Sequence, residues 1–240
     1  MPDTRTHRGS HPEDARSFSD QVIPILRQAT ADLSWLLTRG YAEKAAVKLV
    51  GDRFCLTARQ RLAVMRSACS DQQLSERSSR LIGPDLLAGQ QLALDGYNVL
   101  ITIEAALSGG VLLLGRDGCI RDLASIHGTY RKVEETVPAL ELIRSFTDQL
   151  KVSKVLWVLD SPVSNSGRLK GLILQVGTNA GIPWEVELAR NPDAVLANTG
   201  MVGCTTDGPV LDACSRWTNL TTALIRRLLP AARVIDLGHA

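Results

Sequence analysis

The chain has 240 residues, with 27 Lys and Arg against 25 Asp and Glu, so its formal charge is only +2. Apolar residues make up 45% of the sequence, which is the composition of a globular protein with room for a substantial core. These figures exclude a mostly disordered chain, a collagen-like chain and a disulfide scaffold. The near-neutral total also gives no whole-protein argument for nucleic-acid binding.

The sequence carries no sign of a membrane or secretory segment. No apolar run approaches the roughly 18–20 residues that span a bilayer, and the polar residues 1–16 contain no hydrophobic signal-peptide core. The five cysteines are widely spread and form no CxxC pair, which favours reduced thiols. We therefore expect a cytoplasmic protein with no membrane contact.

The N-terminal third has the pattern of a polar leader followed by helices. Residues 1–16 are rich in charge and lack apolar periodicity, which predicts a disordered leader. Between residues 17 and 84 apolar side chains recur every three or four positions, which predicts a small all-α domain of three or four helices. Thr57 followed by Gln60 is the sequence pattern of a capping box at a helix start.

Charge differs between the two parts of the chain. Residues 1–84 carry 13 basic and 9 acidic side chains and are +4, whereas residues 85–240 carry 14 and 16 and are −2. Arg59 and Arg66, seven residues apart, would share one helix face. Such a face either binds phosphates or is an ordinary solvated surface.

Residues 85–240 alternate short apolar strands with helices. Strands are predicted at residues 90–94, 154–159, 184–188, 201–206 and 232–237, and helices at 132–150, 167–178 and 216–229. A Gly-rich hairpin is expected between residues 109 and 123, with its turn at Asp117-Gly118. This alternation predicts an α/β domain over residues 85–240, with a mostly parallel sheet and helices on both faces.

Three predicted strands finish on an aspartate, at Asp95, Asp160 and Asp207. Ligand sites of open parallel sheets gather at the carboxyl ends of the strands. Three carboxylates there would repel one another unless a cation neutralised them, and their hard oxygen ligands suit Mg²⁺ or Mn²⁺. Glu104, nine residues after Asp95, is a weaker candidate ligand on a helix returning to the same edge. The alternative is that these residues are ordinary turn or helix-cap residues.

A polar loop follows Asp160 and leads into a helix that begins near Gly167. Backbone N–H groups at a helix start favour a phosphate, and Ser164, Asn165 and Ser166 add hydrogen-bonding side chains. Arg168 adds a charge-assisted contact. This is not a Walker loop, since GxxxxGK[ST] is absent, and an ordinary capped turn is the alternative.

A second candidate substrate contact lies at residues 127–131. His127 and Arg131, with a hydroxyl and an aromatic ring between them, would contact RNA by stacking and phosphate pairing. A tightly packed loop is an equally good interpretation of the same residues.

The stretch Leu94-Asp95-Gly96-Tyr97-Asn98 resembles the opening strand of PIN-like nucleases of the NYN type, and Thr205-Thr206-Asp207-Gly208 is similar to their late strand end. The whole chain also resembles an uncharacterised prokaryotic protein family with a helical N-terminal part. The resemblance implies a PIN-like three-layer α/β/α domain whose clustered acids bind Mg²⁺ or Mn²⁺ and cleave RNA. It also makes Asn98 a candidate substrate contact. The hairpin at residues 109–123 departs from the usual pattern.

The sequence therefore favours a metal-dependent ribonuclease. Asp95, Asp160 and Asp207 would hold the ion, whose bound water would attack the phosphorus in line. The principal alternative is a non-catalytic RNA- or protein-binding module on the same fold. A phosphatase or nucleotide-binding enzyme using residues 164–168 ranks lower, because its usual motifs are missing. RNA is the expected partner, and the sequence leaves open whether the chain forms a homo-oligomer.

Overall fold

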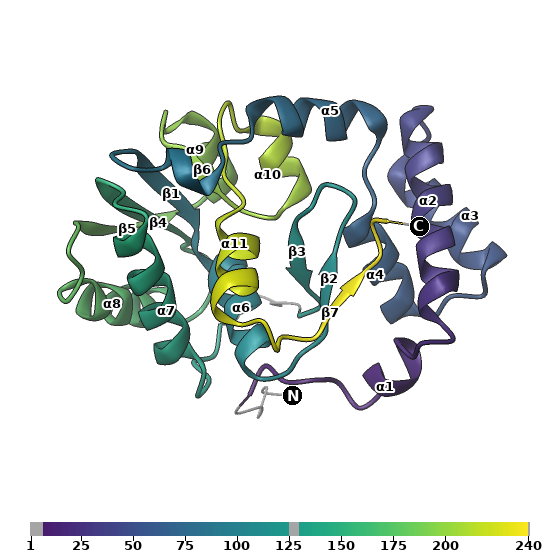
Figure 1. The fold of residues 1–240 in the computed structure, drawn as a ribbon, viewed down its shortest axis with the longest axis horizontal. Helices are drawn as coiled ribbons and strands as arrows, with labels where there is room; N and C mark the ends of the chain where they lie inside the picture. The colour runs from purple at the N-terminus through teal and green to yellow at the C-terminus, as the bar shows by residue number, and fades with distance from the viewer. Residues whose placement is uncertain (1–6, 125–129, 240) are drawn as a thin grey trace.

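The computed structural model describes residues 7–124 and 130–239. The expected RNA contact at His127 therefore lies outside the described residues. Figure 1 shows helices of the N-terminal part on the right, a small sheet in the centre, and the main sheet with its covering helices on the left. Within the two described ranges, no helix combines the length and apolar character needed to cross a membrane.

In the described part of the chain, five helices precede the first strand: α1 (Asp14–Ser17), α2 (Ile23–Thr38), α3 (Glu43–Arg53), α4 (Ala58–Ser67) and α5 (Asp71–Arg80). The helical periodicity of this region is thereby confirmed. At the start of α4, Thr57 and Gln60 form the expected capping box, each side chain accepting from the backbone N–H of the other. Ser70 and Gln73 form a second capping box at the start of α5. These bonds satisfy backbone N–H groups that have no partner inside the helix.

The structure differs from the expected disordered leader at residues 7–16. Asp14 is buried and pairs with Arg59 of α4, with Nε 2.5 Å from Oδ1. Arg8 donates from Nε to the fully buried Glu104 at 2.8 Å. Buried ion pairs join this segment to two separate elements, a long-range effect that composition alone does not reveal.

The main sheet has four parallel strands in the order β5-β4-β1-β6. Its strands are β1 (Gln91–Asp95), β4 (Lys154–Asp160), β5 (Trp184–Ala189) and β6 (Val202–Cys204). A single 3-10 turn, η1 (Pro84–Leu86), leads into β1. The predicted α/β class with a mostly parallel sheet is confirmed at this level.

The helices of this part are α6 (Gly96–Leu107), α7 (Thr136–Gln149), α8 (Ser166–Gly177), α9 (Pro192–Asn198), α10 (Gly208–Ala213) and α11 (Leu220–Leu228). Side chains of the main sheet alternate between two layers of these helices. Leu92 and Leu94 of β1 belong to the buried cluster shared with α6, α7, α8 and α11, whereas Ala93 belongs to the cluster shared with α9 and α10. This is the two-residue period of a strand buried on both faces.

A second sheet, in the order β3-β2-β7, lies between the main sheet and the N-terminal helices (Figure 1). Its strands are β2 (Leu112–Leu114), β3 (Ile120–Asp122) and β7 (Val234–Asp236). The predicted hairpin is confirmed as the antiparallel pair β2–β3, with Gly118 at φ +75° in the turn. Leu113 packs with the N-terminal helices, while Leu112 packs with the main core. A shared hydrophobic cluster therefore crosses the expected boundary at residue 84.

Candidate functional site

Asp95, Asp160 and Asp207 line one pocket of about 340 Å³, together with Asp193. We call this the acidic pocket and define it by these four aspartates. The prediction that the three strand-end acids share one edge of the sheet agrees with this placement. Asp193 is a fourth acid that the sequence reasoning did not select.

Two neighbouring strands, β1 and β4, and the starts of two short helices, α9 and α10, carry the four carboxylates. Asp95 ends β1 and pairs with Val158, so that Asp160 lies two residues further along the adjacent β4. β6 ends at Cys204, earlier than predicted, and Asp207 instead occupies the N-cap position of α10, with its side chain making no capping hydrogen bond. The chain turns away from the sheet after Cys204, and this turn brings Asp207 over the edge next to Asp95.

Asp193 lies in the first turn of α9, where the sequence has a recognisable helix start. Asn191 accepts a hydrogen bond from the N–H of Ala194 at 3.1 Å, and Pro192 occupies the first turn. An Asn-Pro pair at this spacing is a helix-start signal. Because α9 has only seven residues, its periodicity is weak, and the sequence reasoning missed both the helix and Asp193.

The carboxylates of the acidic pocket interact through their charges. Burial raises the pKa of Asp95 to about 7, a hydrogen bond from the Thr205 hydroxyl opposes this shift, and the charges of Asp207 and Asp193 add to it. Burial also raises the pKa of Asp193, and the charges of Asp207 and Asp160 raise it further. The pocket therefore contains more negative charge than it can easily hold at neutral pH without a cation.

The donor set of the acidic pocket suits a hard cation, although it is not a closed metal site. Carboxylate oxygens are the ligands that Mg²⁺ and Mn²⁺ prefer in proteins. Among the described residues, no three His, Cys, Asp or Glu side chains stand close enough together to hold an ion as they are arranged. Mg²⁺ commonly keeps several waters and binds directly to only one or two carboxylates. The pocket fits a hydrated ion better than a dehydrated one.

The structure places Glu104 away from the acidic pocket, so its selection as a metal ligand is corrected. Nine residues of helix separate it from Asp95, a rise of roughly 13 Å. Glu104 is fully buried and accepts hydrogen bonds from Tyr130 at 2.5 Å, Thr136 at 2.6 Å and Arg8 at 2.8 Å. This buried carboxylate therefore has a structural role, because it joins α6 to the segments that carry Tyr130, Thr136 and Arg8.

Asn98 lines the acidic pocket and holds the segment that carries Asp207. Its Oδ1 accepts from the backbone N–H of Thr206 at 2.8 Å and from the Thr206 hydroxyl at 3.0 Å. Thr205 donates to Oδ2 of Asp95 at 2.8 Å. Asn98 therefore lines the acidic pocket and also positions Asp207, because it holds the neighbouring Thr206.

Tyr97 places an unpartnered hydroxyl beside the acidic pocket. The ring is 8% exposed, and within the described ranges its buried Oη has no hydrogen-bond partner. Burial and the charge of Asp160 raise its pKa to about 12, so Tyr97 keeps its proton at neutral pH. A buried donor without a partner costs free energy, and a ligand that accepts from it would recover that cost.

The expected phosphate loop is separated from the acidic pocket. Ser164 and Ser166 line neither the acidic pocket nor the second pocket that lies beside this loop. The Ser166 hydroxyl donates to the carbonyl of Ser161 at 3.4 Å. Asn165 and Arg168 instead line a second pocket of about 480 Å³ together with Arg131. The structure therefore brings three of the predicted phosphate contacts together, but around a different cavity.

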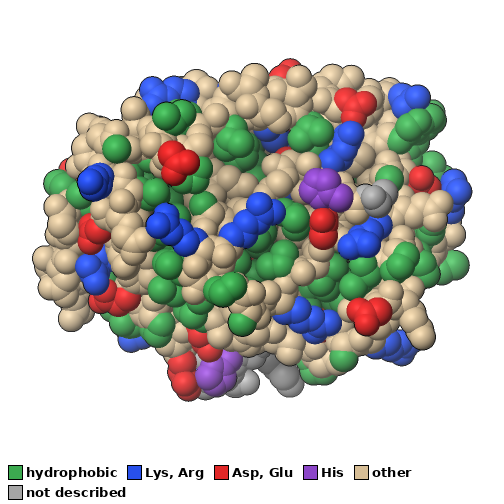
Figure 2. Space-filling model, in the orientation of Figure 1, with side chains coloured by type: hydrophobic (Ala, Val, Ile, Leu, Met, Phe, Trp, Pro, Cys, Tyr) green, Lys and Arg blue, Asp and Glu red, His purple; other side chains and the backbone are tan. Residues whose placement is uncertain are grey.

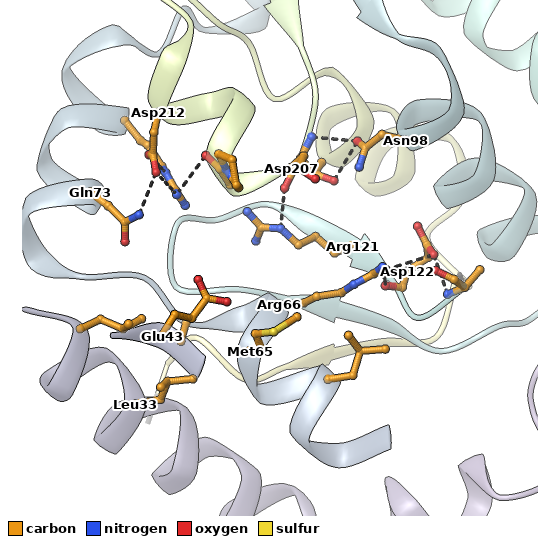
Figure 3. Close-up of a pocket in the computed structure, with 18 of the residues that line it drawn as sticks. Leu33, Glu43, Met65, Arg66, Gln73, Asn98, Arg121, Asp122, Asp207 and Asp212 are labelled. Carbon is orange, nitrogen blue, oxygen red and sulfur yellow. Dashed lines mark hydrogen bonds and ion pairs between the residues drawn. The ribbon is translucent and has the colours of Figure 1, made fainter. Parts of the chain in front are cut away.

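A third hollow, of about 500 Å³, separates the N-terminal helices from the α/β part (Figure 3). It shares Tyr97, Asn98 and Asp207 with the acidic pocket. Arg121 donates from Nε to the carbonyl of Thr206 at 2.6 Å, which fixes the segment next to Asp207 from the other side. Arg66 is engaged with backbone carbonyls of Asp122 and Ala124, at 2.5 and 3.3 Å.

The expected basic face of the helical part is therefore largely used for internal contacts. Arg59 neutralises the buried Asp14, and Arg66 holds the end of the hairpin. On the face shown in Figure 2, Lys and Arg are scattered among acidic and apolar side chains. Neither observation supports a broad surface for nucleic acid on these helices.

Comparison with known proteins places the chain among relatives of undetermined role. A family model described as "Domain of unknown function (DUF5616)" matches residues 84–223, and one described as "Protein of unknown function (DUF434)" matches residues 25–80. "Uncharacterized protein MJ0935" of Methanocaldococcus jannaschii is 28% identical over 186 residues, which are 78% of this chain and 88% of that protein. No solved structure matches the chain. The expected resemblance to an uncharacterised family is thus confirmed, and since the first model spans more than half of the sequence, the chain belongs to the DUF5616 family.

Proposed function

We propose that this protein is a divalent-metal-dependent endoribonuclease, a hydrolase that uses Mg²⁺ or Mn²⁺ to cleave RNA phosphodiester bonds on a PIN-like domain of the NYN type. One observation carries the proposal: four carboxylates from the carboxyl edge of a parallel sheet line a single pocket. Asp95, Tyr97 and Asn98, which belong to the stretch that carries the resemblance, line this pocket. A single chain supplies all four acids, so the proposed site needs no second copy.

Asp95, Asp160, Asp193 and Asp207 would hold the cation, directly or through its waters. When bound, such an ion lowers the pKa of a coordinated water and offsets charge on the phosphodiester. Asp95 would give up its proton as the cation enters, because the positive charge reverses the repulsion that raises its pKa. The Tyr97 hydroxyl would donate to a phosphate oxygen.

The supporting residues keep this edge rigid. Asn98 and Arg121 hold Thr206 from two sides, through its N–H and its carbonyl. Thr205 holds Oδ2 of Asp95. Acids fixed in this way need little reorganisation when substrate and cation bind, which is the main source of electrostatic catalysis.

The alternative function is a non-catalytic RNA- or protein-binding module. The observation in its favour is that, in the described chain, no three metal-binding side chains are arranged as a closed site. Under this alternative the four acids would bind a cationic partner group or remain partly protonated, and RNA would not be cleaved.

The test is cleavage of labelled single-stranded RNA by the purified protein in Mn²⁺ and in EDTA. Activity should require Mn²⁺ and should be lost in Asp95→Asn, which keeps the size and hydrogen bond of Asp95 but removes its charge. The matched control is Asp85→Asn, because Asp85 is an exposed acid outside the pocket. Equal cleavage by wild type and Asp95→Asn would identify a contaminant. Stoichiometric Mn²⁺ binding without any cleavage would favour the binding module.

A further inference from the structure

We propose that the second pocket binds a backbone phosphate of single-stranded RNA and directs the same strand into the acidic pocket. We call it the cationic pocket and define it by Arg131, Lys132, Asn165 and Arg168. This inference rests on the proposed function, because it concerns the substrate of that site. It adds Lys132 to the predicted phosphate contacts. It also proposes that these residues bind a phosphate of the RNA that lies away from the phosphodiester bond at the four aspartates.

The charge of the cationic pocket identifies an anion as its ligand. Its charged lining residues are Arg131, Lys132 and Arg168, and among the described residues no acidic side chain lines it. Within the part of the chain that the structure describes, Lys132 and Arg168 are exposed and have no ion-pair partner. By contrast, Arg59 of the helical part neutralises a buried aspartate. Two unpaired cations at one cavity bind phosphate without first breaking an internal contact.

The other wall of the cationic pocket suits a nucleotide better than a bare anion. Leu169 and Leu172, one turn of α8 apart, line it beside Gln175. An apolar wall next to cations can pack a ribose or base while the phosphate is neutralised. The cavity of about 480 Å³ is within the range of ligand pockets in proteins.

One short loop separates the cationic pocket from the acidic pocket. Pro162 and Val163 line the acidic pocket, whereas Asn165 lines the cationic one. Two trans peptide units span at most about 7.6 Å between the Cα atoms of residues 163 and 165. One extended strand can therefore contact both pockets by crossing this loop.

The loop is held against Tyr130, which ties the two pockets together. The N–H of Tyr130 donates to the carbonyl of Ser164 at 3.2 Å, and Nδ2 of Asn165 donates to the carbonyl of Tyr130 at 3.0 Å. Asn165 adopts a left-handed backbone with φ 70°, a conformation that Asn tolerates better than most residues. On the acidic side, the Tyr97 and Tyr130 ring centroids are 5.4 Å apart. The separation between phosphate contact and acids is thus fixed by the fold.

The test measures RNA binding without cleavage. A 5′-labelled single-stranded oligoribonucleotide is titrated with protein in EDTA at several salt concentrations, and affinity is followed by fluorescence anisotropy. Lys132→Glu with Arg168→Glu should weaken binding by at least about tenfold. The double variant should also reduce the magnitude of the slope of log affinity against log salt by roughly 0.7, the contribution of one phosphate contact on a single strand. Arg168→Lys should retain most of the affinity.

The matched control is Arg226→Glu, which reverses the charge of an exposed arginine of α11 outside the cationic pocket; among the described residues Arg226 has no ion-pair partner. It should leave affinity within about twofold. Equal weakening by Arg226→Glu, or no weakening by the double variant, overturns the cationic pocket as the binding site. Full competition by a millimolar mononucleotide would assign the pocket to a free nucleotide and overturn its role on a strand.

The two proposals fail in different ways. If Asp95→Asn abolishes cleavage while the double variant binds RNA normally, the ribonuclease stands and the cationic pocket is overturned. If the wild-type protein never cleaves RNA but binding depends on Lys132 and Arg168, the proposed reaction fails and the RNA site stands. The Lys132, Arg168 and Arg226 variants change exposed side chains, so each should leave the thermal unfolding curve unchanged.

Discussion

Arg77 of α5 pairs with Asp212 of α10 through two hydrogen bonds, Nε to Oδ1 at 2.7 Å and Nη2 to Oδ2 at 3.0 Å. The same guanidinium donates to Asp117 in the hairpin turn at 2.7 Å and to the carbonyl of Gly208 at 3.2 Å. Gly208 directly follows Asp207, so an arginine from the helical part holds the helix that presents an acid of the acidic pocket. Figure 1 shows α5 running across the top of the molecule toward α10.

Replacing Arg77 by methionine should cost about 3–5 kcal/mol of unfolding free energy, because it leaves the buried Asp117 short of a partner. Burial alone would raise the pKa of Asp117, but the charges of Arg121 and Arg77 hold it down at about 2. Urea denaturation at neutral pH measures the loss. Arg53→Met is the control, since the Arg53 side chain is exposed and its 3.5 Å pair with the half-buried Asp32 should contribute less than about 1 kcal/mol. Similar losses in the two variants would contradict the buried network.

Asp95→Asn should stabilise the metal-free protein at pH 8. The folded-state pKa of Asp95 is raised to about 7, above the value of about 3.9 in an unfolded chain. Between those values the folded state holds a proton that the unfolded state has lost, so stability falls as pH rises, by up to about 1.4 kcal/mol per pH unit. Denaturant curves of both proteins from pH 5 to pH 8 should therefore diverge toward pH 8. Parallel curves would show that Asp95 is ionised throughout.

Mn²⁺ should raise the melting temperature, and by more at pH 8 than at pH 5.5. At the lower pH the cation must displace the proton of Asp95, which weakens its apparent affinity. At one hundred times the dissociation constant the ion contributes about 2.7 kcal/mol to folding. Thermal unfolding with and without Mn²⁺ at both pH values measures the difference, with Ca²⁺-free buffer and Asp85→Asn as references. The same shift at both pH values would mean that Mn²⁺ binds elsewhere.

Tyr97→Phe should reduce RNA cleavage without reducing the free energy of unfolding. The Tyr97 hydroxyl is buried without a partner in the described chain, so its removal should leave unfolding free energy unchanged or slightly increased. Cleavage of RNA should nevertheless fall, because a donor to the substrate is lost. Tyr41→Phe, at an exposed tyrosine, is the control for both measurements. A large loss of stability in Tyr97→Phe would reveal an internal role for the hydroxyl.

Glu104→Gln should destabilise the protein without changing its affinity for Mn²⁺. The buried carboxylate accepts from Tyr130, Thr136 and Arg8, and the neutral amide offers one acceptor in place of two. A loss of about 2–4 kcal/mol is expected for breaking a buried charged network. Isothermal titration with Mn²⁺ provides the second readout. Weaker Mn²⁺ binding by a folded Glu104→Gln variant would show that Glu104 contributes to the metal site after all.

Sequence reasoning located the acidic edge because parallel strands end together, a rule that needs only the strands themselves. It assigned Glu104 wrongly because nine residues of helix carry a side chain away from the edge, and spacing along the chain does not show direction in space. It missed the second sheet because β2 and β7 are 122 residues apart from Leu112 to Val234, and such pairings leave no local periodicity. The ordering of Arg8 likewise depends on Glu104, far away in the sequence.

The position of β2 has a consequence for how the chain can be divided. Leu113 and Leu112 are neighbours, yet one completes the core of the helical part and the other completes the core of the α/β part. Neither part can bury its own apolar face alone. The two regions recognised by separate family models are therefore expected to unfold in one step, and a gene that encoded them separately would have to produce an obligate pair of subunits.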